Sequence, residues 1–195
     1  MIIKIIIRKI VLVGLLVSSS FANEIFIDLT LGHSLNFISY SYTLEDNVGN
    51  GYSNGFEEIE FNLGLRAGVS MDMYDSFGVE PSIGVTTSYL TNIYSLELPV
   101  LYSYENIKFG PLIRYNYLTN IGIKYLDNVV KIEDKTSYSL GVKAIIVTSK
   151  IDYIFSYEYM LNAVYDDESI QNNKTTTTQL NMEGSYFSFG LRVKF

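Results

Sequence analysis

Cysteine and tryptophan are both absent from this 195-residue sequence, and histidine occurs once, as His33. Without cysteine the chain has no disulfide framework, no thiolate zinc cluster and no thiol nucleophile. The formal net charge is −7, so the chain would repel the phosphate backbone of a nucleic acid. The sequence also lacks a phosphate-binding loop, a dinucleotide fingerprint and a haem motif. We therefore predict no nucleic-acid partner, no cofactor and no metal site.

The chain is instead rich in aromatic residues, with 17 Tyr and 11 Phe. Hydrophobic residues make up 48% of the sequence and charged residues 18%, a balance that supports a buried core and excludes general disorder. Many Tyr and Phe are thus combined with few of the residues that do most chemistry. The order of residues along the chain explains this combination.

The first 22 residues have the order of a secretory signal peptide. Lys4, Arg8 and Lys9 precede the uncharged run 10–17, and small residues follow up to Ala22. A membrane-spanning helix needs about 20 consecutive apolar residues. This run is shorter, which favours a cleaved signal peptide. The alternative interpretation is an uncleaved anchor helix. We predict cleavage after Ala22, which leaves a domain of residues 23–195 and changes the net charge from −7 to −10.

Beyond the signal, apolar and polar residues alternate with the period of two that is typical of β-strands. The alternation falls into eight segments: 25–37, 59–71, 77–89, 95–104, 107–117, 138–146, 151–161 and 185–195. Short connections alternate with mostly long ones, as in barrels with short periplasmic turns and long external loops. The short connection around Asn92 is the exception. We predict loops at 45–54 and 166–178, and a hairpin closed by Asp127-Asn128 between residues 118 and 135.

The two faces of these segments differ in charge, which decides which face meets lipid. From residue 59 onward the apolar face carries no Asp, Glu, Lys or Arg. A charge on a lipid face costs about 2–4 kcal/mol at the midplane, so this exclusion favours a hydrocarbon-facing surface. The polar face carries seven acids and six bases: Asp28, Glu58, Glu60, Glu80, Glu97, Asp152, Glu158, Arg66, Lys108, Arg114, Lys143, Arg192 and Lys194.

The polar face also collects the strand glycines, which make room for long charged side chains in a narrow lumen. We therefore predict an all-β fold, an eight-stranded antiparallel up-and-down transmembrane β-barrel with a polar, side-chain-filled interior. Outward aromatic residues near the strand ends are expected to form interfacial girdles. These residues are Phe37, Phe77, Tyr89, Tyr104, Tyr117, Tyr138, Tyr153 and Tyr159.

Two ion pairs and three irregularities are expected inside this barrel. Asp28 is predicted to pair with Arg192 across the closure, and Arg66 with Glu80 across the second hairpin. All three prolines fall inside strands: Pro81, Pro99 and Pro111. A closed barrel has no free edge to accommodate a missing N–H donor, so we expect bulges or water at these positions.

The signal peptide, the amphipathic strands and the final strand Phe187-x-Phe189-x-Leu191-x-Val193-x-Phe195 resemble the small outer-membrane β-barrel family. The chain is similar to the opacity-like, porin-family and outer-membrane protein A-type barrel domains over residues 23–195, as a pattern. The resemblance implies a place in the outer membrane of a Gram-negative-type cell, in contact with membrane lipid and lipopolysaccharide. It also implies that the barrel-assembly machinery recognises the C-terminal strand ending in Phe195.

We predict a non-enzymatic protein without catalytic residues. It would act through its external loops in adhesion, recognition or envelope integrity, with host or surface ligands as partners, or as a very narrow channel. The alternative from another class is an outer-membrane lipid hydrolase, or deacylase, that uses His33 on the lipid face. Ser185 would be its nucleophile, with Glu57 or Glu183 as the orienting acid. A third interpretation is a soluble periplasmic barrel that binds an apolar ligand.

Two acidic groups have both a functional and a structural interpretation. Glu58 and Glu60 would suit a proton or cation site, but the basic residues expected nearby favour structural ion pairs. The run 166–168, Asp-Asp-Glu, would attract Ca²⁺. It lacks the ordered ligand spacing of a calcium loop, so we expect it to be solvated.

Overall fold

The computed structural model describes residues 24–35, 38–46, 51–88, 91–119, 122–125, 128–131, 134–171 and 174–195. The predicted signal peptide, residues 1–22, lies outside the described residues. All regular secondary structure in the described part of the chain is β-strand. Within these residues there is no helix of the length and hydrophobicity that a membrane crossing requires.

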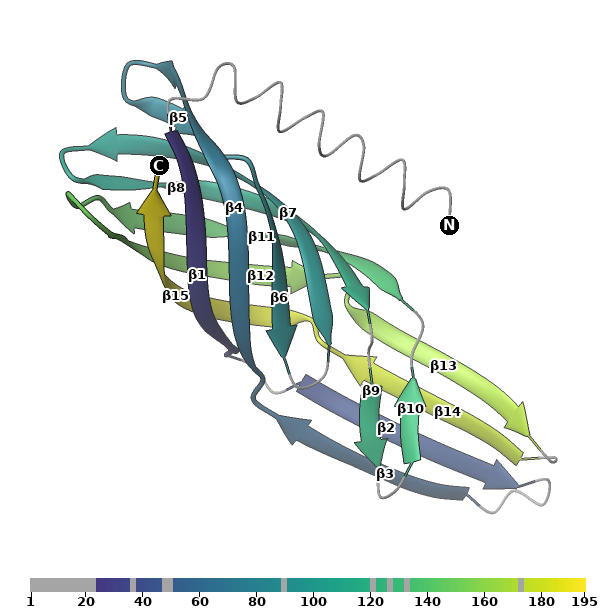
Figure 1. Cartoon of the computed structure of the whole chain (residues 1–195). Helices are drawn as coiled ribbons and strands as arrows, with labels where there is room; N and C mark the ends of the chain where they lie inside the picture. Colours follow the sequence, from purple (N-terminus) through teal and green to yellow (C-terminus); the bar gives the residue numbers. More distant parts are fainter. Residues whose placement is uncertain are drawn as a thin grey trace.

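Nine strands form one closed antiparallel barrel. They are β1 (Glu24–Ser34), β4 (Phe61–Tyr74), β5 (Phe77–Val79), β6 (Ser82–Ser88), β7 (Asn92–Tyr104), β8 (Ile107–Thr119), β11 (Lys135–Ile146), β12 (Asp152–Leu161) and β15 (Gly184–Lys194). Strands β5 and β6 share one position between β4 and β7, and β1 pairs with both β15 and β4. The ring therefore has eight positions and no free edge (Figure 1). The predicted eight-stranded up-and-down barrel is confirmed.

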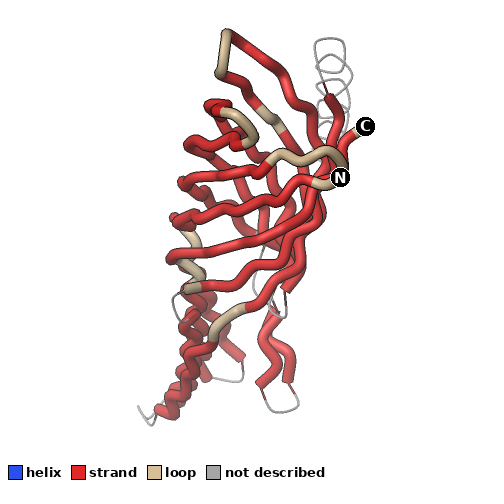
Figure 2. Tube along the Cα trace, turned by 90° about the vertical axis from the view of Figure 1, so that its left-hand side faces the viewer, coloured by secondary structure: helices blue, strands red, loops and turns tan. Residues whose placement is uncertain are grey.

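Among the described residues, three hairpins extend the strands beyond one end of the barrel, which we call the hairpin end (Figure 2). Their strands are β2 (Ile38–Asp46) with β3 (Gly51–Glu58), β9 (Gly122–Tyr125) with β10 (Asn128–Lys131), and β13 (Val164–Gln171) with β14 (Lys174–Asn181). Strand β14 also pairs with β2, which makes a four-stranded sheet in the order β13-β14-β2-β3. The predicted hairpin between residues 118 and 135 is present as β9 and β10.

The loops predicted at 45–54 and 166–178 are largely strands instead. Their pairing joins two hairpins that lie far apart in the sequence, with Thr178 opposite Tyr42. Backbone hydrogen bonding between hairpins does not require the hydrophobic alternation on which the loop prediction was based.

The other end of the barrel carries short connections, and we call it the turn end. Asp75 and Glu105 adopt positive φ angles of 43° and 53° in the β4–β5 and β7–β8 turns. The β11–β12 turn is held by Thr148, whose backbone N–H donates to Asp152 Oδ1 at 2.8 Å and whose hydroxyl donates to Ile151 O at 2.7 Å. The predicted asymmetry between short and long connections is therefore present.

The three prolines lie in three neighbouring strand positions. Pro81 separates β5 from β6, while its carbonyl still accepts the N–H of Val69 at 3.2 Å. The β7–β8 pairing is interrupted between Pro99 and Tyr102, in the stretch that would pair with Gly110 and Pro111. The register is the same on both sides of Pro81 and on both sides of the β7–β8 interruption, so the pairing lapses there without the predicted β-bulges. Pro99 itself stays in register with Leu112.

The outward and inward faces have the predicted characters. On β1 the outward side chains Ile27 and Leu29 are 41% and 50% exposed, whereas the inward Asp28 is 1% exposed. Glycine makes room inside, because a Cβ on Gly84 would lie 2.3 Å from Arg66 Cγ. Among the predicted girdle residues, Phe77, Tyr104, Tyr138, Tyr153 and Tyr159 are exposed, Tyr117 is half-buried, and Phe37 and Tyr89 lie outside the described residues.

Candidate functional site: the closed lumen and the hairpin-end sheet

The inward charges form ion pairs that cross the lumen. Arg192 on β15 donates two hydrogen bonds to Asp28 on β1, Nε to Oδ1 at 2.7 Å and Nη2 to Oδ2 at 2.9 Å. Its Nη1 also donates to Glu80 Oε2 at 2.6 Å. The guanidinium lies 3.6 Å from the centre of the Phe26 ring, which adds a cation–π contact. The predicted Asp28–Arg192 pair is therefore confirmed.

Glu97 on β7 is the second centre of this network. It pairs with Lys143 at 2.7 Å, with Arg114, and with Arg66 at 3.4 Å. Arg114 reaches further to Glu158 Oε1 at 2.6 Å. All five of these side chains are nearly inaccessible to solvent. Buried charges are tolerated when they are paired in this way, so the network fixes the side chains across the middle of the lumen.

The predicted Arg66–Glu80 pair is wrong. Gly84 lies opposite Arg66 in the β4–β6 register, and its missing side chain leaves space for Arg66 against β6. The guanidinium there meets Glu97 of β7. Glu80 instead pairs with Arg192 and, at 3.2 Å, with Lys108. Packing against a neighbouring glycine therefore determined which carboxylate Arg66 contacts.

Apolar side chains close the lumen at the hairpin end. They form one buried cluster: Ile93, Leu118, Met160, Ala163, Tyr165, Leu180, Met182 and Tyr186. We call this cluster the apolar plug. The Tyr186 hydroxyl donates to the carbonyl of Met182 at 2.7 Å. Tyr165 and Leu180 come from the paired strands β13 and β14, so the plug joins the barrel to the four-stranded sheet. Burial raises the pKa of the Tyr165 phenol.

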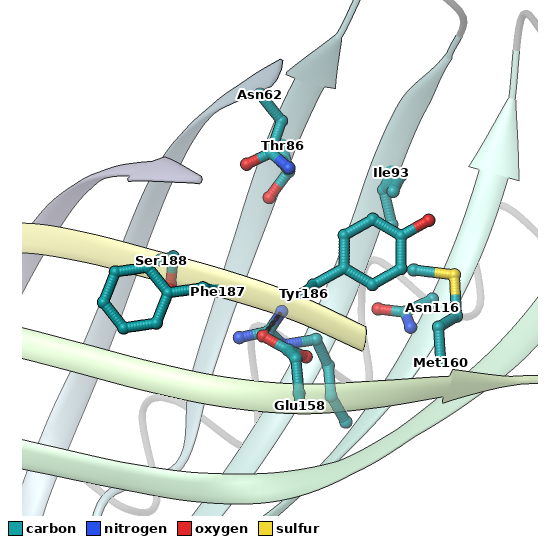
Figure 3. A pocket seen from close by; sticks show the side chains of 10 residues that line it. Asn62, Thr86, Ile93, Asn116, Glu158, Met160, Tyr186, Phe187 and Ser188 are labelled. Carbon is teal, nitrogen blue, oxygen red and sulfur yellow. Dashed lines mark ion pairs between the residues drawn. The ribbon is translucent and has the colours of Figure 1, made fainter. Parts of the chain in front are cut away.

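A cavity of about 30 Å³ remains between the plug and the ion pairs. Figure 3 shows Asn62 and Thr86 on one side of it, and Glu158 and Met160 on the other. This volume suits a water molecule or two and is too small for a nutrient-sized solute. In the described part of the chain, charged side chains therefore fill the middle of the lumen and the apolar plug fills its hairpin end.

The residues of the hydrolase alternative have other contacts. His33 faces outward between Phe61 and Phe187, with ring centres 6.0 and 6.2 Å away, and its Nδ1 lies 3.0 Å from the Ser34 carbonyl. The Ser185 hydroxyl instead hydrogen-bonds to the Tyr157 hydroxyl at 2.8 Å.

Of the two candidate orienting acids, the Glu183 carboxylate accepts the backbone N–H of Asn162 at 2.7 Å. The Glu57 side chain lies outside the described ones. The described contacts of His33, Ser185 and Glu183 do not form a catalytic triad.

The acidic groups singled out from the sequence differ in their surroundings. Glu60 is buried, accepts a hydrogen bond from the Ser88 hydroxyl and has no basic ion-pair partner among the described residues. The ion pair expected for Glu60 is therefore wrong. The side chains of Glu58 and of residues 166–168 lie outside the described ones. In the described part of the chain, no group of three His, Cys, Asp or Glu side chains is arranged to hold a metal ion.

No protein-family model matches this chain, and no curated protein matches it. Solved structures do match. The outer membrane protein OprG from Pseudomonas aeruginosa is 13% identical, with a TM-score of 0.50 over 89% of this chain and 97% of that one. The chain has the fold of a small outer-membrane β-barrel. Neisserial surface protein A matches with 13% identity and a TM-score of 0.44, over 88% of this chain and 97% of that one.

Sequence reasoning missed two features of this outer-membrane barrel fold. The apolar plug combines inward residues of the barrel with Tyr165 and Leu180, which flank the loop predicted at 166–178. The four-stranded sheet depends on the pairing of β14 with β2. The β-branched run Thr175–Thr178 was a usable signal, because threonine favours strands even where hydrophobic alternation is weak.

Proposed function

We propose that this protein is a non-enzymatic barrel of the outer membrane that acts through its hairpin end in adhesion or recognition, or in envelope integrity. The observation that carries the proposal is the combination of a closed lumen with a four-stranded sheet standing beyond it. A pore needs an open passage, and paired charges and apolar side chains fill this one. The sheet is the largest feature that the fold adds to the bare barrel.

The exposed apolar band supports residence in a membrane. Outward side chains such as Leu65 and Val142 are more than half exposed, 52% and 55%. A soluble protein rarely exposes a continuous apolar belt of this kind. We propose that membrane lipid and lipopolysaccharide cover it, that residues 1–22 direct export through a cleaved signal, and that the hairpin end faces outward. The assembly machinery of a Gram-negative-type cell is the proposed partner of the strand ending in Phe195.

Shortening the sheet tests the recognition role. In the variant, residues 41–55 and 167–178 are each replaced by a short turn, which keeps Tyr165 and Leu180 in the plug. Cells that display either form are passed over surfaces coated with polylysine, polyglutamate, dextran or phospholipid. We expect the full-length form to be retained on at least one surface and the shortened form to be lost from it. Equal retention on every surface would contradict recognition by the sheet.

Two further measurements separate this proposal from its rivals. The purified full-length barrel is expected to give no steady ionic current in a planar lipid bilayer, whereas a narrow channel would conduct. His33→Ala is expected to release no fewer acyl chains from phospholipid and lipopolysaccharide than the unmodified protein does, because neither protein is expected to hydrolyse them. Acyl release that depends on His33 would establish the hydrolase instead.

A further inference from the structure

The four-stranded sheet leaves strand edges unpaired. In the order β13-β14-β2-β3, strand β13 pairs only with β14 and β3 only with β2 among the described strands. The barrel below has no such edge, because its first and last strands meet. Figure 1 shows β13 at the margin of the sheet, with β14 on one side. An unpaired edge is a row of backbone donors and acceptors that accepts an added strand.

The sheet is strongly acidic. Its strands carry one base, Lys174, against seven acids: Glu45, Asp46, Glu57, Glu58, Asp166, Asp167 and Glu168. Three of these acids are consecutive on β13. The register places Asp166 and Glu168 on one face of the sheet, opposite Gln179 and Thr177, and Asp167 on the other face, opposite Thr178. Strand β13 therefore carries acidic residues at register positions of both faces.

This charge selects among the possible occupants of the edge. A second copy of the chain would bring acids against acids, and like charges directly opposite each other destabilise a strand pair. An anionic or neutral strand would gain no charge pairing. A strand with lysine or arginine at every second position would place its cations on the face that carries residues 166 and 168, because the side chains of a strand alternate between its two faces.

We propose that the free edge of β13 binds an extended cationic segment of another protein or peptide, which adds to the sheet as a fifth strand beside β13, on the side away from β14. The proposal rests on the recognition role above and names its partner class. Backbone pairing with β13 provides the attachment, and the acids at 166–168 provide the preference for basic sequence. The acids also keep two copies of the sheet from pairing edge to edge.

Binding of defined peptides to the purified full chain tests this inference. The probe is a fluorescent ten-residue peptide of alternating lysine and threonine, and its anisotropy is followed with the barrel in a zwitterionic detergent. A glutamate–threonine peptide is the charge control. A lysine–threonine peptide with alternate backbone nitrogens methylated keeps its charge but cannot donate along the paired edge. We expect only the lysine–threonine peptide with an unmodified backbone to bind.

A matched pair of variants locates the site. The triple variant Asp166→Asn, Asp167→Asn, Glu168→Gln removes the charge of β13, and Glu57→Gln with Glu58→Gln removes two acids from the opposite edge. From the free energy that cross-strand charge pairs usually contribute, we expect the triple variant to bind the peptide about tenfold more weakly. The second variant is expected to change peptide binding less than about twofold. Heat-dependent gel mobility checks that both variants fold.

Three results would overturn the inference: no binding of the lysine–threonine peptide, equal binding of its methylated form, or equal loss in both variants. If the triple variant fails to fold, the comparison of methylated and unmethylated peptides with the unmodified protein decides alone. Failure here leaves the recognition role intact if the shortened sheet still loses retention on another surface. If no peptide binds and the shortened sheet is also retained as well as the full-length form, the recognition role is removed as well.

Discussion

Arg192 and Asp28 hold the barrel closed at the point where its last strand meets its first, through two hydrogen bonds of 2.7 and 2.9 Å between a guanidinium and a carboxylate. The two residues are direct partners in the β1–β15 register. Both side chains are only 1% exposed, and Arg192 also contacts Glu80. Planar groups paired through two bonds are among the stronger charge pairs in proteins.

Arg192→Met leaves the carboxylates of Asp28 and Glu80 buried without their main partner. We expect a loss of about 3–5 kcal/mol in the free energy of unfolding, which is the usual cost of breaking a buried pair from one side. Urea unfolding in lipid vesicles measures it. Adding Asp28→Asn is expected to recover part of the loss, because it removes one uncompensated charge. Lys150→Met, in an exposed turn, is the control, and a similar small change in both variants would contradict the assignment.

The two-layer closure of the lumen predicts how ionic current responds to substitution. Tyr186→Ala removes a large part of the apolar plug, but Arg114 and Glu158 still cross the lumen beneath it. We expect a loss of about 3–5 kcal/mol of stability and no steady current in a planar bilayer.

Adding Arg114→Ala to Tyr186→Ala removes a cation from both Glu97 and Glu158. The double variant is expected to conduct and to prefer cations, as its reversal potential in a salt gradient would report. Equal current from the single and double variants would mean that the plug alone closes the lumen.

The outward face of β4 tests the assignment of lipid to the outside. Leu65 lies in the middle of the strand, paired with Leu29 and Val85, whereas Met73 lies near its turn end. Arginine at a lipid-facing position costs about 2–4 kcal/mol at the midplane and about 0–1 near the interface. Leu65→Arg is therefore expected to destabilise the barrel in vesicles much more than Met73→Arg. A barrel in water would tolerate the two equally, since both positions are exposed.

The fold class was predictable because the alternation of apolar and polar residues within each strand indicates which of its faces meets lipid. Along β4, apolar residues from Phe61 to Met71 occur at every second position, which a closed amphipathic barrel requires. The Asp28–Arg192 pair followed from the same logic, because closure brings the first strand against the last. These features depend on local alternation and on the rule that the first and last strands of a closed barrel are neighbours.

The missed features depend on contacts that alternation does not encode. Arg66 reaches Glu97 because Gly84 leaves space beside it, and this depends on how β4 and β6 are aligned. Strand β14 pairs with β2 across most of the length of the sequence, through backbone groups that every residue carries. The polar composition of that sheet resembles a loop until its partner strand is known.

Phe195 distinguishes a role in assembly from a role in stability. Its backbone N–H donates to the Ile25 carbonyl at 2.9 Å, and Phe195→Ala keeps this bond. The side chain is 73% exposed, so its loss should change the unfolding free energy by less than about 1 kcal/mol. We expect refolding into detergent to be normal and the amount of folded barrel in cells to fall several-fold, measured by heat-dependent gel mobility. Phe187→Ala removes an outward aromatic from within the same strand and is expected to assemble normally. Normal assembly of Phe195→Ala would show that the terminal aromatic is not the signal.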